Sequence, residues 1–480
     1  MERLKLSGRS DLHVYFWPHA ASLLADGGYF GFLTSASWLD VEYGFHLQRW
    51  ILTNFEIIGV FESICEPWFT GARVATAVTV LRRCNDSERR MQNIVRFVQL
   101  RKPLKELLEH DGTEVGRQEA VERLRNLIEK TTEHTRTNDY RILVIPQKKL
   151  WQDGCYLQRI CRQPSVDEEG ETETTSFKSP SILQEEPRPY DDSSDYLGSK
   201  WGVYLRAPDL YFELMERFGG AFVPLGEIAH VRYGFKSGCD DFFTPTDIST
   251  EALEVKDASE FRHRYRCPQQ EVRTGKIRIV RAGDGSEHPI ESKYLLPEVH
   301  SLMSIEGVRL NDQIKRVILL VNEPVHALKG TYVLAYLKYG ERETFGGDTT
   351  VPNRDTCAGR PVWYDLTNYP TGRIILPIIV QYRHIVSWNP DGLPVNHALM
   401  AVDCKNMERN KALAAVLNST LVAFIKPYFS RKLGNEANTQ LDVYAANILP
   451  VPECHNNVGQ GDRTARYQLR RFRGAAQFCN

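Results

Sequence analysis

Several patterns are missing from this sequence, and each absence argues against a class of protein. Its ten cysteines form no Cys-x-x-Cys pair, the closest spacing being that of Cys155 and Cys161, so neither a zinc site nor a disulfide framework is indicated. The thirteen histidines show no His-Glu-x-x-His spacing, which argues against a metal-dependent nuclease and leaves no residue to assign as a metal ligand. Cysteine usage of this kind fits a reducing cytoplasm.

The sequence also lacks a long apolar run and an excess of charge of one sign. No stretch approaches the length that crosses a bilayer, and charged residues interrupt the N-terminus where a signal peptide has its apolar core. We therefore expect a cytoplasmic protein with no membrane partner. Basic and acidic residues number 60 and 61, so any contact with nucleic acid must be local.

A length of 480 residues predicts two or three domains. Composition divides the chain into a first domain at 1–150, an acidic linker or mobile loop at 163–199, a second domain at 200–453 and a basic tail at 454–480. The linker is rich in Glu, Asp, Ser, Thr and Pro, which bury too little apolar area to order a chain.

Residues 1–150 alternate helix and strand patterns. Helices are predicted at 11–24 and 44–54, strands at 29–34, 55–61, 75–81 and 140–146, and helix-favouring charged residues at 102–134. Repeated helix–strand units predict a mainly parallel α/β sheet. In the second domain, strands are predicted at 277–280, 317–321, 374–376 and 378–380 and helices at 205–218 and 411–428, which indicates mixed α and β structure.

Specific segments then resemble a known family. Residues 7–16 (SGRSDLHVYF) and 23–40 (LLADGGYFGFLTSASWLD) look like the segment after the catalytic loop of TaqI-type adenine-N6 DNA methyltransferases. Residues 200–209 and 224–238 resemble the opening of that family's target-recognition domain, and 414–420 and 448–452 resemble its end. The closest resemblance is to the C-terminal part of the large restriction-modification and phage-exclusion methylases.

The resemblance implies an α/β fold in which a partial methyltransferase (Rossmann-like) sheet precedes a mixed α+β target-recognition domain. The complete enzyme would transfer a methyl group from S-adenosylmethionine to adenine N6 in double-stranded DNA. The family's Asn-Pro-Pro-Tyr loop does not occur in this sequence, and Gly27-Gly28 leads into a strand, not into a phosphate-binding helix. We therefore assign no catalytic or cofactor-binding residue, and we expect the chain alone to be inactive and not to bind the cofactor.

Basic residues near aromatic ones mark candidate DNA contacts, because arginine can bond guanine bidentately and an aromatic ring can stack an unpaired base. The candidates are Arg232, Lys236, Arg354, Arg360, Trp363, Arg383, Arg431 and Lys432. Surface salt bridges, or a solvated hairpin at 232–238, would give the same patterns. Trp38 and Phe69 could line a base pocket, although core packing explains each more simply.

Three interpretations of the whole chain remain open. It may be a methyltransferase fragment that needs an upstream-encoded half or a nuclease subunit, a non-catalytic DNA-specificity subunit of a restriction-modification or phage-defence complex, or the product of a decayed gene. A half sheet would expose an apolar edge, so residues 1–150 are expected to be poorly stable without a partner that supplies the missing strands.

Overall fold

The computed structural model describes residues 4, 10–69, 74–156, 196–301, 307–308, 310, 314–380, 384–432 and 439–453. The predicted basic tail at 454–480 lies outside them, as does the predicted acidic linker up to residue 195. Residues 196–199, which were predicted to end the linker, are described, and Tyr196 and Ser199 are buried against the first part of the chain. Tyr196 and Ser199 both bond Gln48, which ties this last segment to the first part of the chain.

The first part of the chain builds a six-stranded sheet with the order β1-β3-β2-β4-β6-β5. Its elements are α1 (His13–Ala21), β1 (Tyr29–Ser35), α2 (Glu42–Asn54), β2 (Phe55–Ser63), β3 (Thr76–Arg83), α3 (Ser87–Gln92), β4 (Ile94–Leu100), α4 (Leu104–Leu107), α5 (Glu114–Lys130), β5 (Thr135–Arg136), β6 (Tyr140–Pro146) and α6 (Gln147–Tyr156). The predicted helices and strands are confirmed here, although the first helix ends at Ala21.

The α/β class is confirmed, but the expectation of a mainly parallel sheet is wrong. Only β2 and β4 pair in parallel, whereas β3 runs antiparallel to both β1 and β2, and β6 runs antiparallel to β4 and β5. A parallel pair needs a long crossover connection, usually a helix, and residues 64–75 between β2 and β3 contain no described helix. The helix and strand periods in the sequence do not record strand direction.

The second part of the chain holds antiparallel sheets among short helices, which confirms its mixed character. The largest sheet has the order β16-β14-β17-β8. The strands are β7 (Phe222–Pro224), β8 (Ala229–Tyr233), β9 (Thr246–Asp247), β10 (Ile277–Arg281), β11 (Glu287–Glu291), β12 (Leu295–Pro297), β13 (Val317–Leu319), β14 (Ile374–Pro377), β15 (Ile379–Val380), β16 (Ser387–Trp388), β17 (Leu399–Cys404), β18 (Arg431–Lys432), β19 (Thr439–Gln440) and β20 (Pro450–Pro452).

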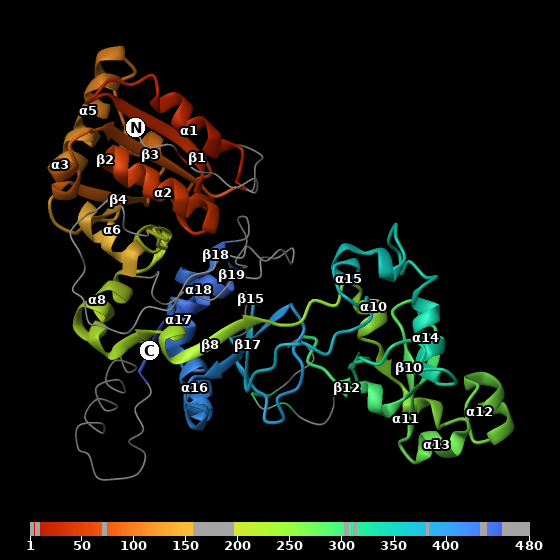
Figure 1. The fold of residues 1–480 in the computed structure, drawn as a ribbon. Helices are drawn as coiled ribbons and strands as arrows, with labels where there is room; N and C mark the ends of the chain where they lie inside the picture. Colours follow the sequence, from red (N-terminus) through yellow and green to blue (C-terminus); the bar gives the residue numbers. More distant parts are fainter. Residues whose placement is uncertain are drawn as a thin grey trace, which may run out of the picture.

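The helices of this part are α7 (Gly202–Arg206), α8 (Asp209–Phe218), α9 (Leu225–Ile228), α10 (Asp240–Phe243), α11 (Ser249–Ala252), α12 (Ala258–Tyr265), α13 (Gln269–Arg273), α14 (Tyr332–Gly340), α15 (Asp355–Ala358), α16 (Asn410–Leu417), α17 (Thr420–Phe429) and α18 (Val443–Asn447). In Figure 1 the first sheet lies at one end, the β8–β17 sheet with α16–α18 in the middle, and the α10–α15 region at the other end. The single helices predicted at 205–218 and 411–428 are each two helices. The first breaks before Pro208, because a residue that precedes proline disfavours helical backbone.

Among the described residues no single helix is long and apolar enough to cross a membrane, while Met407–Leu417 and Thr420–Phe429, bent by 82°, pass that test only as a pair. Both helices contribute buried side chains to the core beneath the β8–β17 sheet, among them Leu413 and Ile425.

The two parts of the chain meet at α7, where Trp201 and Leu205 belong to the core of the first sheet. The Arg206 guanidinium bonds the carboxylate of Asp40 and lies 2.9 Å from that of Glu62. Burial lowers the pKa of Arg206, but these two carboxylates outweigh burial and raise it above its ordinary value. Gly202 permits this approach, since a Cβ there would lie 2.4 Å from an Asp40 carboxylate oxygen.

Replacing Arg206 with methionine should lower the free energy of unfolding by about 3–5 kcal/mol, because two buried carboxylates would lose their partner. Urea unfolding followed by tryptophan fluorescence measures this loss. Arg217→Met, an exposed position on α8, is the matched control. An Arg206→Met loss no larger than that of the control would contradict the role of this cluster.

Lys426 on α17 is 1% exposed, and its Nζ has no hydrogen-bond partner among the described residues. Burial lowers the pKa of this lysine to about 8. Because the unfolded chain keeps its proton to higher pH, stability should rise between about pH 8 and pH 10.4, by up to roughly 3 kcal/mol. In Lys426→Met this rise should disappear and stability at pH 7 should increase. Thermal unfolding across that range, with exposed Lys411→Met as the control, would refute the expectation if the rise persisted in Lys426→Met.

Candidate nucleic-acid interface

The loop at 234–239, which follows β8, brings four of the predicted DNA-contact residues together. Gly234 donates to the carbonyl of Leu399 at 3.0 Å, and a Cβ on Gly234 would lie 2.2 Å from the carbonyl oxygens of residues 395 and 396. Gly238 has a φ of 86°, in the region that favours glycine. The glycines of this motif are thus explained by close packing and a tight turn within the protein.

Arg354 and Arg360 support this loop. Arg354 donates to the carbonyls of Gly238 at 3.2 Å and Thr344 at 2.6 Å. The Arg360 Nη2 donates to the carbonyls of Lys236 and Ser237 at 2.8 and 2.6 Å. Burial lowers the pKa of Arg360, and its guanidinium lies 5.3 Å from the centre of the Phe243 ring. Both arginines therefore use donors on backbone carbonyls that hold the loop in place.

Lys236 and Trp363 differ in how far they reach solvent. Lys236 is exposed at the tip of the loop, above the carbonyl that Arg360 holds. Trp363 is half-buried and packs at 5.7 and 6.2 Å, between ring centres, against Phe242 and Phe243. The loop therefore presents a lysine, while the tryptophan mainly fills the core below it.

The remaining candidates lie on other elements. Arg232 on β8 is half exposed, 3.8 Å from the carboxylate of Asp403 on neighbouring β17. Arg431 on β18 bonds Gln440 at 2.7 Å and lies near enough to Tyr43 of the first part to lower that tyrosine's pKa against the larger effect of burial. Lys432 also lies in β18, and Arg383 lies outside the described residues. Figure 1 separates β18 from α10 and α15, so the candidates form at least two groups.

Trp38, considered as an edge of a base pocket, is fully buried, with its ring 5.5 Å from that of Trp17 and 5.7 Å from that of Trp201. Phe69 is 43% exposed. The simpler interpretation of Trp38 as a core residue is confirmed.

The turn at Gly27-Gly28 does not fit a cofactor cradle. Gly27, with a φ of 81°, donates to the carbonyl of Arg83, and Gly28 donates to that of Ala25. These amides serve the β1–β3 pairing and the turn itself, and β1 follows directly, so no helix N-terminus faces a phosphate or a carboxylate there. Among the residues that the structure describes, no three of His, Cys, Asp and Glu lie close enough to hold a metal ion.

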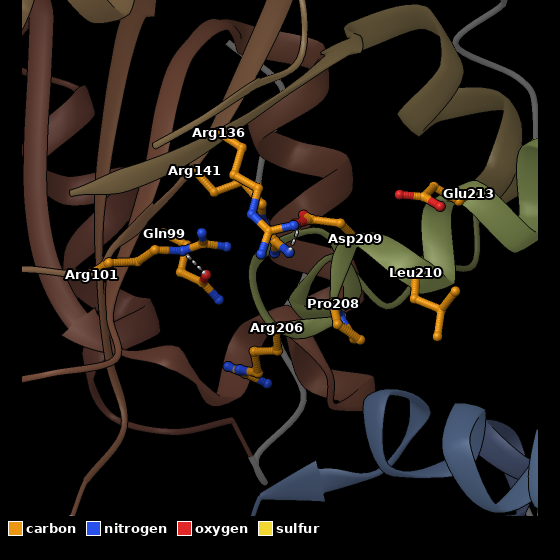
Figure 2. A pocket seen from close by; sticks show the side chains of 9 residues that line it. All are labelled: Gln99, Arg101, Arg136, Arg141, Arg206, Pro208, Asp209, Leu210 and Glu213. Carbon is orange, nitrogen blue, oxygen red and sulfur yellow. Dashed lines mark hydrogen bonds and ion pairs between the residues drawn. The ribbon is translucent and has the colours of Figure 1, made fainter. Parts of the chain in front are cut away.

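Sequence reasoning missed a cleft that four arginines line. The cleft has a volume of about 420 Å³ and lies between the end of β4 and the start of α8 (Figure 2). Its lining residues are Gln99, Arg101, Arg136, Arg141, Arg206, Pro208, Asp209, Leu210 and Glu213. The lining comes from separate segments between Gln99 and Glu213, so no local pattern in the sequence could have joined them.

Comparisons with known proteins give the family context. The sequence matches no curated protein. Twenty-nine chains of solved structures match, among them the type IIG restriction endonuclease BpuSI, at 11% identity and a TM-score of 0.36 over 98% of this chain and 44% of that one. The type IIL restriction-modification enzyme MmeI in complex with DNA matches at 11% identity and a TM-score of 0.38 over 92% of this chain and 42% of that one. The chain thus spans less than half the length of either enzyme.

Residues 3–66 match the Eco57I restriction-modification methylase family. This segment contains α1, β1, α2 and β2. The predicted resemblance to restriction-modification methylases is confirmed over this segment.

Proposed function

We propose that this chain is part of an adenine-N6 DNA methyltransferase of the TaqI-type class, and that its second part recognises the DNA target. The observation that carries the proposal is the match of residues 3–66 to a restriction-modification methylase family. The methyl donor of the complete enzyme would be S-adenosylmethionine. This sequence contains no Asn-Pro-Pro-Tyr loop and its glycine turn does not fit the cofactor, so this chain needs another segment or subunit for methyl transfer.

Exposed apolar side chains in and around α1 and at the start of β1 support a partner beside the sheet. Phe16 in α1 is 55% exposed, Leu12 and Leu23 at either end of this helix are 72% and 80% exposed, and Tyr29 at the start of β1 is 57% exposed. β1 ends the six-stranded sheet, and no described strand pairs with its outer edge. Exposed apolar side chains near an unpaired strand edge favour association with another segment. A methyltransferase half that carries the missing loop is the partner we propose.

DNA recognition is proposed for the second part. Lys236 at the loop tip and Arg232 on β8 are the exposed cations best able to reach phosphates, and we propose that Arg354 and Arg360 act by holding the loop. Arg431 and Lys432 of β18 remain proposed contacts of a second group, and Trp363 beside the loop and Arg383, outside the described residues, remain proposed contacts as well. A non-catalytic specificity subunit is the alternative function, and the missing tetrapeptide favours it.

Transfer of radiolabelled methyl groups to unmethylated DNA distinguishes these functions. We expect none from the chain alone and activity at adenine when a methyltransferase half that carries the Asn-Pro-Pro-Tyr loop is added. Activity from the chain alone would disprove its dependence on another segment. No methyl transfer in either mixture, with salt-sensitive DNA binding retained, would identify a specificity subunit.

Lys236→Gln and Arg360→Gln should distinguish a residue that contacts DNA phosphates from a residue that stabilises the 234–239 loop. Loss of the lysine charge should reduce the slope of log affinity against log salt by about 0.9 for all duplexes, with unfolding unchanged. Loss of the Arg360 guanidinium should also lower stability by about 1.5–3 kcal/mol, because several charged hydrogen bonds break. Duplex titration at several salt concentrations and thermal unfolding measure both effects, with exposed Lys338→Gln as the control. An unchanged slope in Lys236→Gln would remove this loop from the DNA interface.

A further inference from the structure

The arginine cleft balances its charges but leaves Arg101 without an ion pair among the described residues. Arg206 pairs with Asp40 and Glu62, and Arg136 and Arg141 share the carboxylate of Asp209. Arg101 donates at 3.1 and 3.2 Å to neutral acceptors, the Gln99 Oε1 and the carbonyl of Thr137. With Glu213, the four arginines thus face four carboxylates, and the guanidinium of Arg101 is the one that bonds only neutral groups among the described residues.

One donor of Arg141 lacks an acceptor among the described residues. The side chain is 2% exposed, and its Nε has no hydrogen-bond partner there, while its Nη atoms donate to Asp209 at 3.3 Å and to the carbonyls of residues 204, 205 and 207. Burial lowers the pKa of Arg141, and the nearby charges of Arg101 and Arg136 lower it further against the opposing effect of Asp209. An oxyanion in the cleft would offset this repulsion among the guanidinium groups.

The place of the cleft in the fold also favours a ligand. Gln99 and Arg101 stand where β4 ends, and Arg206 bonds Glu62 near the end of the parallel neighbour β2. Ligands of α/β sheets bind outside the carboxyl ends of parallel strands. The first turn of α8, with Pro208, Asp209 and Leu210, forms the opposite wall (Figure 2).

We propose that the arginine cleft binds a phosphate group, and that its source is a backbone phosphodiester of DNA. A phosphodiester carries one negative charge, which would pair with the guanidinium of Arg101, and guanidinium groups suit phosphate oxygens in geometry. The choice of DNA as the source rests on the proposed function. The same chemistry would accept the phosphate of a free anion or a nucleotide.

Arg101 and Arg136 can be replaced without removing a side chain from the hydrophobic core. Arg136 is 65% exposed and Arg101 is half-buried beside the cleft. In the full chain, Arg101→Gln and Arg136→Gln should each reduce the slope of log affinity against log salt by about 0.9 and weaken every duplex alike. Arg125→Gln on α5, which is 57% exposed and paired with Glu122, is the matched control and should leave the slope unchanged. Thermal unfolding of each variant checks that the fold is intact.

Calorimetric titration with inorganic phosphate separates the sources. Reduced slopes support the DNA backbone, whereas unchanged slopes with phosphate binding that Arg101→Gln abolishes would assign the cleft to a free phosphate. Unchanged slopes without phosphate binding would overturn the proposal. If the wild-type chain binds no duplex, DNA recognition fails as the proposed function, and the phosphate titration alone decides for or against the cleft.

Discussion

The buried ion pairs of Arg206 with Asp40 and Glu62 fix how the two parts of the chain meet. Asp40 lies between β1 and α2, Glu62 lies near the end of β2, and Arg206 is the last residue of α7. One guanidinium therefore connects two segments of the first part of the chain to the start of the second part. Trp201, one turn earlier, enters the first core. Burial of three charged groups is favourable only when the geometry is good, which makes the position of α7 exacting.

The same constraint shapes the arginine cleft. The chain leaves α7 before Pro208 and enters α8 at Asp209. Because α7 is held against the sheet, the start of α8 lies opposite residues of β4 and β6. Arg141 reaches the carbonyls at the end of α7, and Gln99 bonds one of them at 2.7 Å. The polar wall of the cleft is thus built from groups that also satisfy the buried backbone of the junction.

Several arginines in this molecule stabilise the backbone by hydrogen bonds to main-chain carbonyls. Arg354 and Arg360 hold the 234–239 loop as Arg141 holds α7, in each case by donating to main-chain carbonyls. A guanidinium has five donors in a fixed plane, so it can satisfy several carbonyls at once. A basic residue in an aromatic-rich segment is therefore as compatible with loop support as with a nucleic-acid contact, and only its exposure and partners distinguish the two.

Local periodicity alone determined the α/β class and most helices and strands of the first sheet, though not β4, because helix and strand patterns depend on neighbours within a few positions. The motifs of residues 7–40 carried the family resemblance, and basic residues near aromatic ones marked the segments around the 234–239 loop. Only the tertiary structure decided strand direction, the burial of Tyr196 and Ser199 and the meeting of Arg101, Arg141 and Arg206 in one cleft. Those features arise from contacts between residues far apart in the chain, whose energies leave no repeating pattern in the sequence.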